Sequence, residues 1–185
     1  MSRSVQWLLC VFLILALAFP AWGREQQVEF IELPKPVFDG MVSVERAIKE
    51  RRTIRAFRPD PLNMAQLSQL LWAAQGITDE RRGLRAAPSG GALYPLDVYA
   101  VVGERGVEGL GVGIYHYRPA SHSLEIISTG DMRREAAHAA LSQIWIATAP
   151  VVLVITAEYE RITQKYGERG VRYAHIEVGH AGQNI

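Results

Sequence analysis

The chain has 185 residues, of which 49% are hydrophobic and 21% are charged, with 20 basic and 19 acidic side chains. This length and apolar content predict one folded domain with its own core. A formal net charge of +1 excludes a strongly basic nucleic-acid-binding domain. The single cysteine, Cys10, excludes an intramolecular disulfide framework and a thiolate zinc cluster.

Residues 1–23 have the layout of a secretory signal. Arg3 precedes an apolar stretch over residues 7–19, and small residues follow before position 24. Cleavage there predicts an exported protein, periplasmic or extracellular. The alternative is a membrane anchor formed by residues 5–22, although a membrane-spanning helix needs about 20 apolar residues.

Residues 24–42 form a polar, proline-containing lead-in, and the apolar periodicity that follows predicts two helices. Ser43 is suited to cap the first helix, which runs to about Arg52. Asn63 begins the second helix in a capping-box arrangement, and Gly76 ends it.

The second half of the chain predicts a loop, then strands and helices in mixed order. The loop covers residues 78–92. Strands are expected over 96–102, 113–119, 123–128 and 151–157. Helices are expected over 131–146, over 158–166 and from 171 onward. The last helix has no stop signal before Ile185, so we expect the chain to be a fragment or a truncated reading frame.

Three guanidinium groups cluster where the first predicted helix ends. Arg51, Arg52 and Arg55 surround the hydroxyl of Thr53. Arginine binds phosphate oxygens with two parallel hydrogen bonds, so this cluster is a candidate phosphate site. The alternative is a basic surface that faces solvent and binds no ligand.

A second candidate is the glycine-containing loop formed by Pro88, Ser89, Gly90 and Gly91. Glycines let a backbone approach a flat or anionic ligand closely. The alternative is a tight turn that leads into the next strand. The residues do not match a P-loop or a Rossmann fingerprint.

The sequence predicts neither a metal site nor a catalytic side chain. His175 and His180 are five residues apart, which points them in different directions on a helix. A zinc pair on a helix needs a spacing of four, and the HExxH and GxSxG motifs are absent.

The motifs RRTIRAF, LLWAAQGI, PSGGALYP, GIYHYRP and RYAHIEVGHAGQN follow one another in this chain. In this order they resemble the flavin-dependent nitroreductase superfamily. The PSGGALYP loop with the YHY hairpin is most similar to the azoline dehydrogenase branch of thiazole and oxazole peptide biosynthesis. The resemblance covers residues 43–185. It implies an α+β fold, with a central mixed, mainly antiparallel sheet wrapped by helices, and a homodimer.

The resemblance also implies noncovalent FMN at the dimer interface. The family's arginine motif, which holds the phosphate and ribityl chain, corresponds here to Arg51, Arg52, Thr53 and Arg55. The family's ring-contacting loop corresponds to Pro88, Ser89, Gly90 and Gly91. Ala92 stands where many classical nitroreductases have asparagine, as expected for the azoline dehydrogenase-like branch.

The implied activity is that of an FMN-dependent oxidoreductase. Hydride or electrons would pass between a reduced donor, such as NAD(P)H, and a small organic substrate: a nitroaromatic, a quinone or an azoline-type heterocycle. The alternative is an exported or anchored remnant of this fold that holds no flavin. The predicted organisation is a signal or anchor over 1–23, the lead-in over 24–42 and an FMN-binding domain over 43–185 that lacks its C-terminal part.

Overall fold

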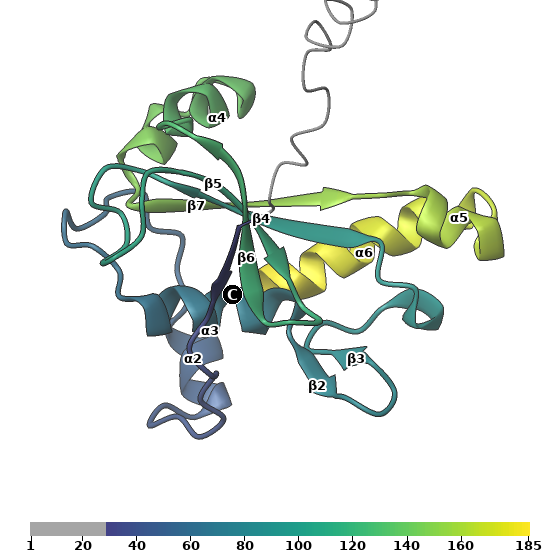
Figure 1. Cartoon of the computed structure of the whole chain (residues 1–185). Helices are drawn as coiled ribbons and strands as arrows, with labels where there is room; N and C mark the ends of the chain where they lie inside the picture. Colours follow the sequence, from purple (N-terminus) through teal and green to yellow (C-terminus); the bar gives the residue numbers. More distant parts are fainter. Residues whose placement is uncertain (1–28) are drawn as a thin grey trace, which may run out of the picture.

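Five strands form the central sheet of the computed structural model, which describes residues 29–185 (Figure 1). They are β1 (Phe30–Glu32), β4 (Leu96–Val102), β5 (Gly113–Arg118), β6 (Ser123–Thr129) and β7 (Val151–Ala157). Their spatial order is β1-β6-β5-β4-β7. Every pairing in this sheet is antiparallel. The described strands therefore confirm the antiparallel part of the expected mixed sheet and contain no parallel pair.

Helices cover the sheet, which confirms the expected α+β class. They are α2 (Val44–Glu50), α3 (Met64–Gln75), α4 (Arg133–Ala139), α5 (Glu160–Tyr166) and α6 (Arg169–Asn184). Two 3₁₀ turns, η1 (Gly90–Ala92) and η2 (Ile144–Thr148), and a small hairpin, β2 (Ile77–Asp79) with β3 (Leu84–Arg85), complete the elements. In Figure 1, α3 and α6 lie on one side of the sheet and α4 lies on the other.

The predicted helix caps are present. The Ser43 hydroxyl accepts a hydrogen bond from the Arg46 backbone N–H at 3.3 Å. Asn63 and Gln66 form a reciprocal capping box, with both bonds at 2.9 Å. Gly76 ends α3 and donates its N–H to the Trp72 carbonyl at 2.7 Å. These local bonds satisfy backbone groups at helix ends, which explains why the sequence places both helices correctly.

The main core lies between α3 and one face of the sheet. Leu67 and Leu71 of α3 are fully buried against Val98 and Val102 of β4. Alternate residues of β4 point to the same face of the sheet, so the predicted strand over 96–102 supplies a continuous apolar surface to α3. This packing fixes the position of β4 and of the loop that precedes it.

Three parts of the chain differ from the expected elements. The lead-in over 24–42 contributes β1, which pairs with β6 at the sheet edge. The expected loop over 78–92 contains the β2–β3 hairpin and the η1 turn. The helix expected over 131–146 is interrupted after α4, because Leu141 and Ser142 adopt left-handed φ values of 57° and 56°. An α-helix requires negative φ, so it cannot continue through these two residues.

A half-buried histidine, His122, links the lead-in, α3 and the β5–β6 turn. His122 Nε2 lies 2.9 Å from the Pro34 carbonyl oxygen and 2.8 Å from Ser68 Oγ. His122 Nδ1 shares a hydrogen bond of 2.9 Å with the Tyr117 hydroxyl. Burial also raises the pKa of Tyr117 well above its usual value, so this phenol stays protonated.

His122→Ala is expected to lower the free energy of unfolding by about 1–3 kcal/mol, because it leaves the buried Tyr117 hydroxyl without its partner. Urea unfolding measures the change. His138→Ala is the matched control, since His138 is exposed on α4. Equal stabilities of the two variants would contradict the structural role of His122.

No helix within residues 29–185 is long and apolar enough to cross a membrane. The predicted signal over 1–23 and the alternative anchor over 5–22 lie outside the described residues.

Candidate cofactor site

The predicted ligand loop has an unusual backbone. Gly91, Ala92 and Tyr94 have left-handed φ values of 66°, 53° and 47°. The Ser89 hydroxyl accepts a hydrogen bond from the Tyr94 backbone N–H at 2.9 Å, which holds the turn in shape. Strained backbone of this kind is kept where the surrounding structure fixes it, and it is common at ligand sites.

The loop packs closely on α5 and α6, and at Gly91 a side chain cannot be added without movement of a neighbour. A Cβ built on Gly91 would lie 2.6 Å from Tyr166 Oη and 3.0 Å from Lys165 Nζ. A Cβ on Gly90 would lie 3.4 Å from Ile162 Cδ1. Lys165 and Tyr166 are therefore polar neighbours of the loop. The sequence alone does not indicate this.

A buried carboxylate lies behind the same loop. Glu177 of α6 is 1% exposed, and neither of its carboxylate oxygens has a hydrogen-bond partner within the described residues. It borders a cavity of about 130 Å³ together with Pro88, Gly90 and His180. Burial raises the pKa of the Glu177 carboxyl, while nearby Ser89 and Arg85 act in the opposite direction.

Glu177→Gln is expected to stabilise the protein at about pH 8 by about 1–3 kcal/mol, the cost of an unpaired buried group. The raised pKa means that the folded state holds a proton that the unfolded state has released. Stability is therefore greatest below the unfolded pKa and falls as pH rises through the folded one. Glutamine has no charge, so the gain should vanish near about pH 4.

Urea unfolding at several pH values tests this expectation. Glu80→Gln is the control, because Glu80 is exposed at the β2–β3 turn. A Glu177→Gln variant whose stability follows the parent at every pH would show that the carboxyl is not the source of the pH dependence.

The predicted arginine cluster lies after α2 and is exposed throughout. Arg52 Nη1 donates to the carbonyl oxygens of Lys49 and Arg51 at 3.0 and 2.7 Å, so part of this side chain caps the helix. The Arg55 guanidinium lies 5.6 Å from the ring centre of Trp145 in η2. The side chains of Arg51 and Thr53 form no hydrogen bond within the described residues, so both are free to meet a ligand.

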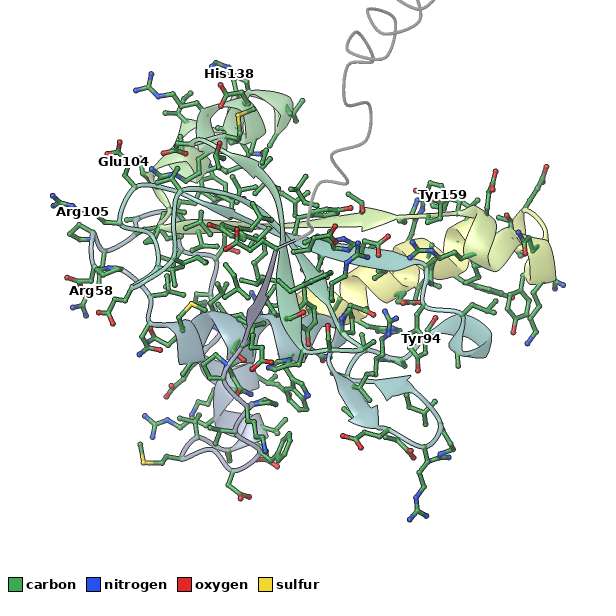
Figure 2. The ribbon with its side chains drawn as sticks, in the orientation of Figure 1. Arg58, Tyr94, Glu104, Arg105, His138 and Tyr159 are labelled. Atoms are coloured by element: carbon green, nitrogen blue, oxygen red, sulfur yellow. The ribbon has the colours of Figure 1, made fainter. Side chains whose placement is uncertain are left out.

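Within a single protomer, the arginine cluster and the Pro88–Gly91 loop lie far apart. Arg55 lies against η2, which precedes β7, whereas Gly91 lies against α5, which follows β7. A seven-residue strand is about 20–24 Å long. Figure 2 shows the same separation, with Arg58 and Tyr94 on opposite sides of the molecule.

The sequence does contain a signal for Glu177. Four positions of α6 recur at spacings of four, three and four along one face: Gly170, Ala174, Glu177 and Ala181, all of them buried. A carboxylate within a stripe of small buried residues is uncommon, because an ionised group is costly to bury. By contrast, Lys165 and Tyr166 carry no pattern that distinguishes them from a polar helix end.

The described residues contain no cluster of three or more possible metal ligands. His175, one of the two histidines considered for a zinc pair, shares a hydrogen bond of 2.8 Å with the Tyr159 hydroxyl.

Comparison with known proteins identifies the fold family. The model of the nitroreductase family matches residues 48–185, which is most of the chain. The chain belongs to the nitroreductase family. Members of this family are oxidoreductases and generally use flavin, and the matches place this nitroreductase-family chain in the azoline dehydrogenase-like branch.

Three relatives illustrate the similarity. MJ1384 of Methanocaldococcus jannaschii, provisionally named a nitroreductase, is 46% identical over 144 residues, covering 78% of this chain and 71% of that protein. The microcin B17-processing protein McbC of Escherichia coli is 31% identical over 128 residues, covering 66% of this chain and 46% of McbC. A crystal structure of a provisionally named nitroreductase of Ralstonia eutropha superposes with a TM-score of 0.70 at 28% identity, covering 89% of this chain and 72% of that one.

Proposed function

We propose that this nitroreductase-family chain binds FMN noncovalently and transfers hydride or electrons between a reduced donor and a small organic substrate. The observation that carries the proposal is the geometry of the Pro88–Gly91 loop. Its backbone is held in a strained turn, and Gly91 lies so close to Tyr166 and Lys165 that a side chain there would displace them. This arrangement suits a flat ring that must approach the backbone closely.

Several residues fit the cofactor. The exposed guanidinium groups of Arg51 and Arg55 would bind the phosphate, and the Thr53 hydroxyl would bind the ribityl chain or the phosphate. Lys165 Nζ and Tyr166 Oη provide hydrogen-bond donors beside the loop. When bound, FMN supplies the hydride chemistry, while the protein orients it and excludes water.

A homodimer is part of the proposal, because the two parts of the site lie on opposite sides of one chain. A second copy related by two-fold symmetry would bring the arginines of one protomer to the loop of its partner. The α2 region supports this, since its apolar side chains are exposed: Met41, Val44 and Ile48 are 105%, 70% and 63% exposed. Exposed apolar patches of this kind mark interaction surfaces.

The donor and substrate follow from the resemblance and from the relatives. We propose NAD(P)H as the donor where the substrate is a nitroaromatic or a quinone, which would be reduced. An azoline-type heterocycle would instead be oxidised, and it would itself pass two electrons to the flavin. McbC is named for processing microcin B17, which supports including heterocycles in a substrate screen. Two assays of the FMN-loaded chain test this part of the proposal: oxidation of NADPH with a nitroaromatic or a quinone, and anaerobic bleaching of the bound FMN by an azoline.

The first experiment is a titration of the purified chain with FMN and with riboflavin, which lacks the phosphate. We expect FMN to bind tightly enough to survive dialysis, and riboflavin to bind at least about tenfold more weakly because the arginines lose their partner. Sedimentation should show a dimer in the FMN-bound sample. A chain that stays colourless after dialysis would support the flavin-free alternative and contradict the proposal.

We also propose that the protein is exported, on the basis of the predicted signal over 1–23. Mass spectrometry of the protein from its natural host tests this. A mature chain that begins near residue 24 supports cleavage and export, whereas a chain that keeps residues 1–23 supports the anchor.

A further inference from the structure

The two central strands of the sheet separate at one end. β4 pairs with β5 only between Tyr99–Val102 and Gly113–His116. Residues 96–98 of β4 have β7 on one side and no strand on the other. The stacked rings of Tyr99 and His116, with centres 4.5 Å apart, form the last cross-strand pair. Beyond them the strands diverge and leave a cleft.

This cleft is a cavity of about 270 Å³. Its polar wall consists of Gln75, Arg85, Asp97, His116, Arg118 and Arg161, and its apolar wall includes Leu96, Val98, Pro119 and Ala120. Ligand pockets are typically about 300–1,000 Å³, and this cleft lies just below that range, so it suits a molecule smaller than a typical drug. Residues 96–98 of β4, which have no partner strand on this side within the described residues, are fewer than the roughly five to six residues of an ordinary strand. We therefore do not expect a peptide ligand to bind here by pairing with β4.

Charges in the cleft leave one cation without a counterion. Arg161 pairs with Asp97 at 2.9 Å, and Arg118 pairs with Glu125. Within residues 29–185, no carboxylate lies within 4.0 Å of the Arg85 guanidinium. Arg85 instead donates through Nη1 to the Gln75 side-chain oxygen at 3.0 Å and lies over the Tyr94 ring at 4.6 Å.

We propose that this cleft binds a small monocarboxylate with an apolar body, held by the Arg85 guanidinium. Arg85 is half-buried, and most of its N–H groups have no hydrogen-bond partner within the described residues, so a carboxylate would satisfy them with two parallel bonds. Asp97 and Glu125 pair with the other two arginines, and Glu177, which also attracts Arg85, forms no ion pair with it within 4.0 Å. A bound monocarboxylate would therefore be the direct counterion of Arg85. The apolar wall would contact the body of the ligand.

This site is distinct from the proposed flavin site and does not depend on it, although the two adjoin. The Arg85 backbone N–H donates to the Tyr94 hydroxyl at 3.1 Å, and the Tyr94 backbone N–H donates to Ser89 Oγ in the Pro88–Gly91 loop. The inference therefore goes beyond the proposed oxidoreductase activity, and it is testable without flavin.

Isothermal titration calorimetry of the full chain, without added FMN, tests the proposal with benzoate as the probe. Benzamide has the same shape without the charge and serves as the neutral control. We expect saturable one-site binding of benzoate and at least about tenfold weaker binding of benzamide. Equal binding of both, no binding of benzoate, or tighter binding of inorganic phosphate than of benzoate would overturn the proposal.

Three variants locate the site. Arg85→Gln should weaken benzoate binding about tenfold or more, whereas Arg82→Gln in the same hairpin should leave it unchanged, because Arg82 is exposed and pairs with Asp79. Ala120→Trp fills the mouth of the cleft from an exposed position and should also abolish binding, even if Arg85→Gln fails to fold. Benzoate binding to Ala120→Trp with parental affinity would place the site elsewhere and refute the proposal.

Discussion

Arg51→Ala is expected to weaken FMN binding by about 1.5–3 kcal/mol, which is roughly 10- to 150-fold in Kd. Arg51 is the cleaner of the two adjacent arginines to replace. Its side chain forms no hydrogen bond within the described residues, whereas Arg52 Nη1 caps the end of α2. A loss in the Arg51 variant would therefore report on phosphate contact and not on helix capping. Flavin fluorescence during titration measures the Kd.

Two controls separate phosphate binding from general effects. Arg58→Ala removes an exposed arginine in the same segment, whose guanidinium pairs with Asp60 at 2.7 Å, and should leave the Kd unchanged. Riboflavin should bind the parent and Arg51→Ala equally well, because it has no phosphate. If Arg51→Ala binds FMN as tightly as the parent, the assignment of the arginine cluster is wrong.

Gly91→Ala is expected to weaken FMN binding at least about tenfold, or about 1.4 kcal/mol. Gly91 has a φ of 66°, and the added Cβ would lie 2.6 Å from Tyr166 Oη. The tyrosine must move, and its hydroxyl is one of the donors that we propose to border the cofactor. The positive φ adds a stability cost of about 1–2 kcal/mol for alanine.

Gly83→Ala isolates the conformational part of this effect. Gly83 has a φ of 64°, and nothing lies within 4 Å of the position that an added methyl group would take, so alanine there incurs the backbone cost alone. Urea unfolding should show that both variants are destabilised, Gly91→Ala more than Gly83→Ala because Tyr166 must also move, while only Gly91→Ala should lose flavin. A loss of flavin in both variants would mean that the effect is one of stability.

Mixing the two binding-deficient variants tests whether the site is shared between protomers. If Arg51 of one protomer and Gly91 of its partner contact the same FMN, a mixed dimer of Arg51→Ala with Gly91→Ala has one intact site. After unfolding and refolding together, an equal mixture should recover roughly a quarter of the parental sites. If both residues served a site within one chain, mixing would restore nothing.

The sequence predicts the local elements of this fold well. The strands over 96–102 and 151–157 have the observed bounds, because each is a short apolar run bounded by proline or glycine. The caps at Ser43 and Asn63 are correct because a cap depends on residues three positions apart. The strand over 30–32 could not be predicted, since it is stabilised by pairing with β6, more than 90 residues later, and by packing of Ile31 on the core.

The break between α4 and η2 has a different cause. The alanine-rich stretch that begins α4 favours a helix, but the chain must turn to reach β7. The Arg133 side chain holds this turn, with Nη1 donating to the Ala149 carbonyl oxygen at 2.6 Å. A contact across 16 residues thus overrides the local preference, which the apolar pattern alone does not reveal.

By itself the sequence determined the family, the core strands and the two groups of residues that are candidates for FMN. Caps, turns and apolar runs are short-range features, so residues close together in the chain are sufficient to specify them. Only the tertiary structure decided that Lys165, Tyr166 and the buried Glu177 lie beside the Pro88–Gly91 loop. It also decided that the arginines lie on the opposite side of the chain and that β4 and β5 diverge around Arg85. These relations depend on the length of β7 and on how α5 and α6 pack back against the loop, and such distances arise only when distant segments meet.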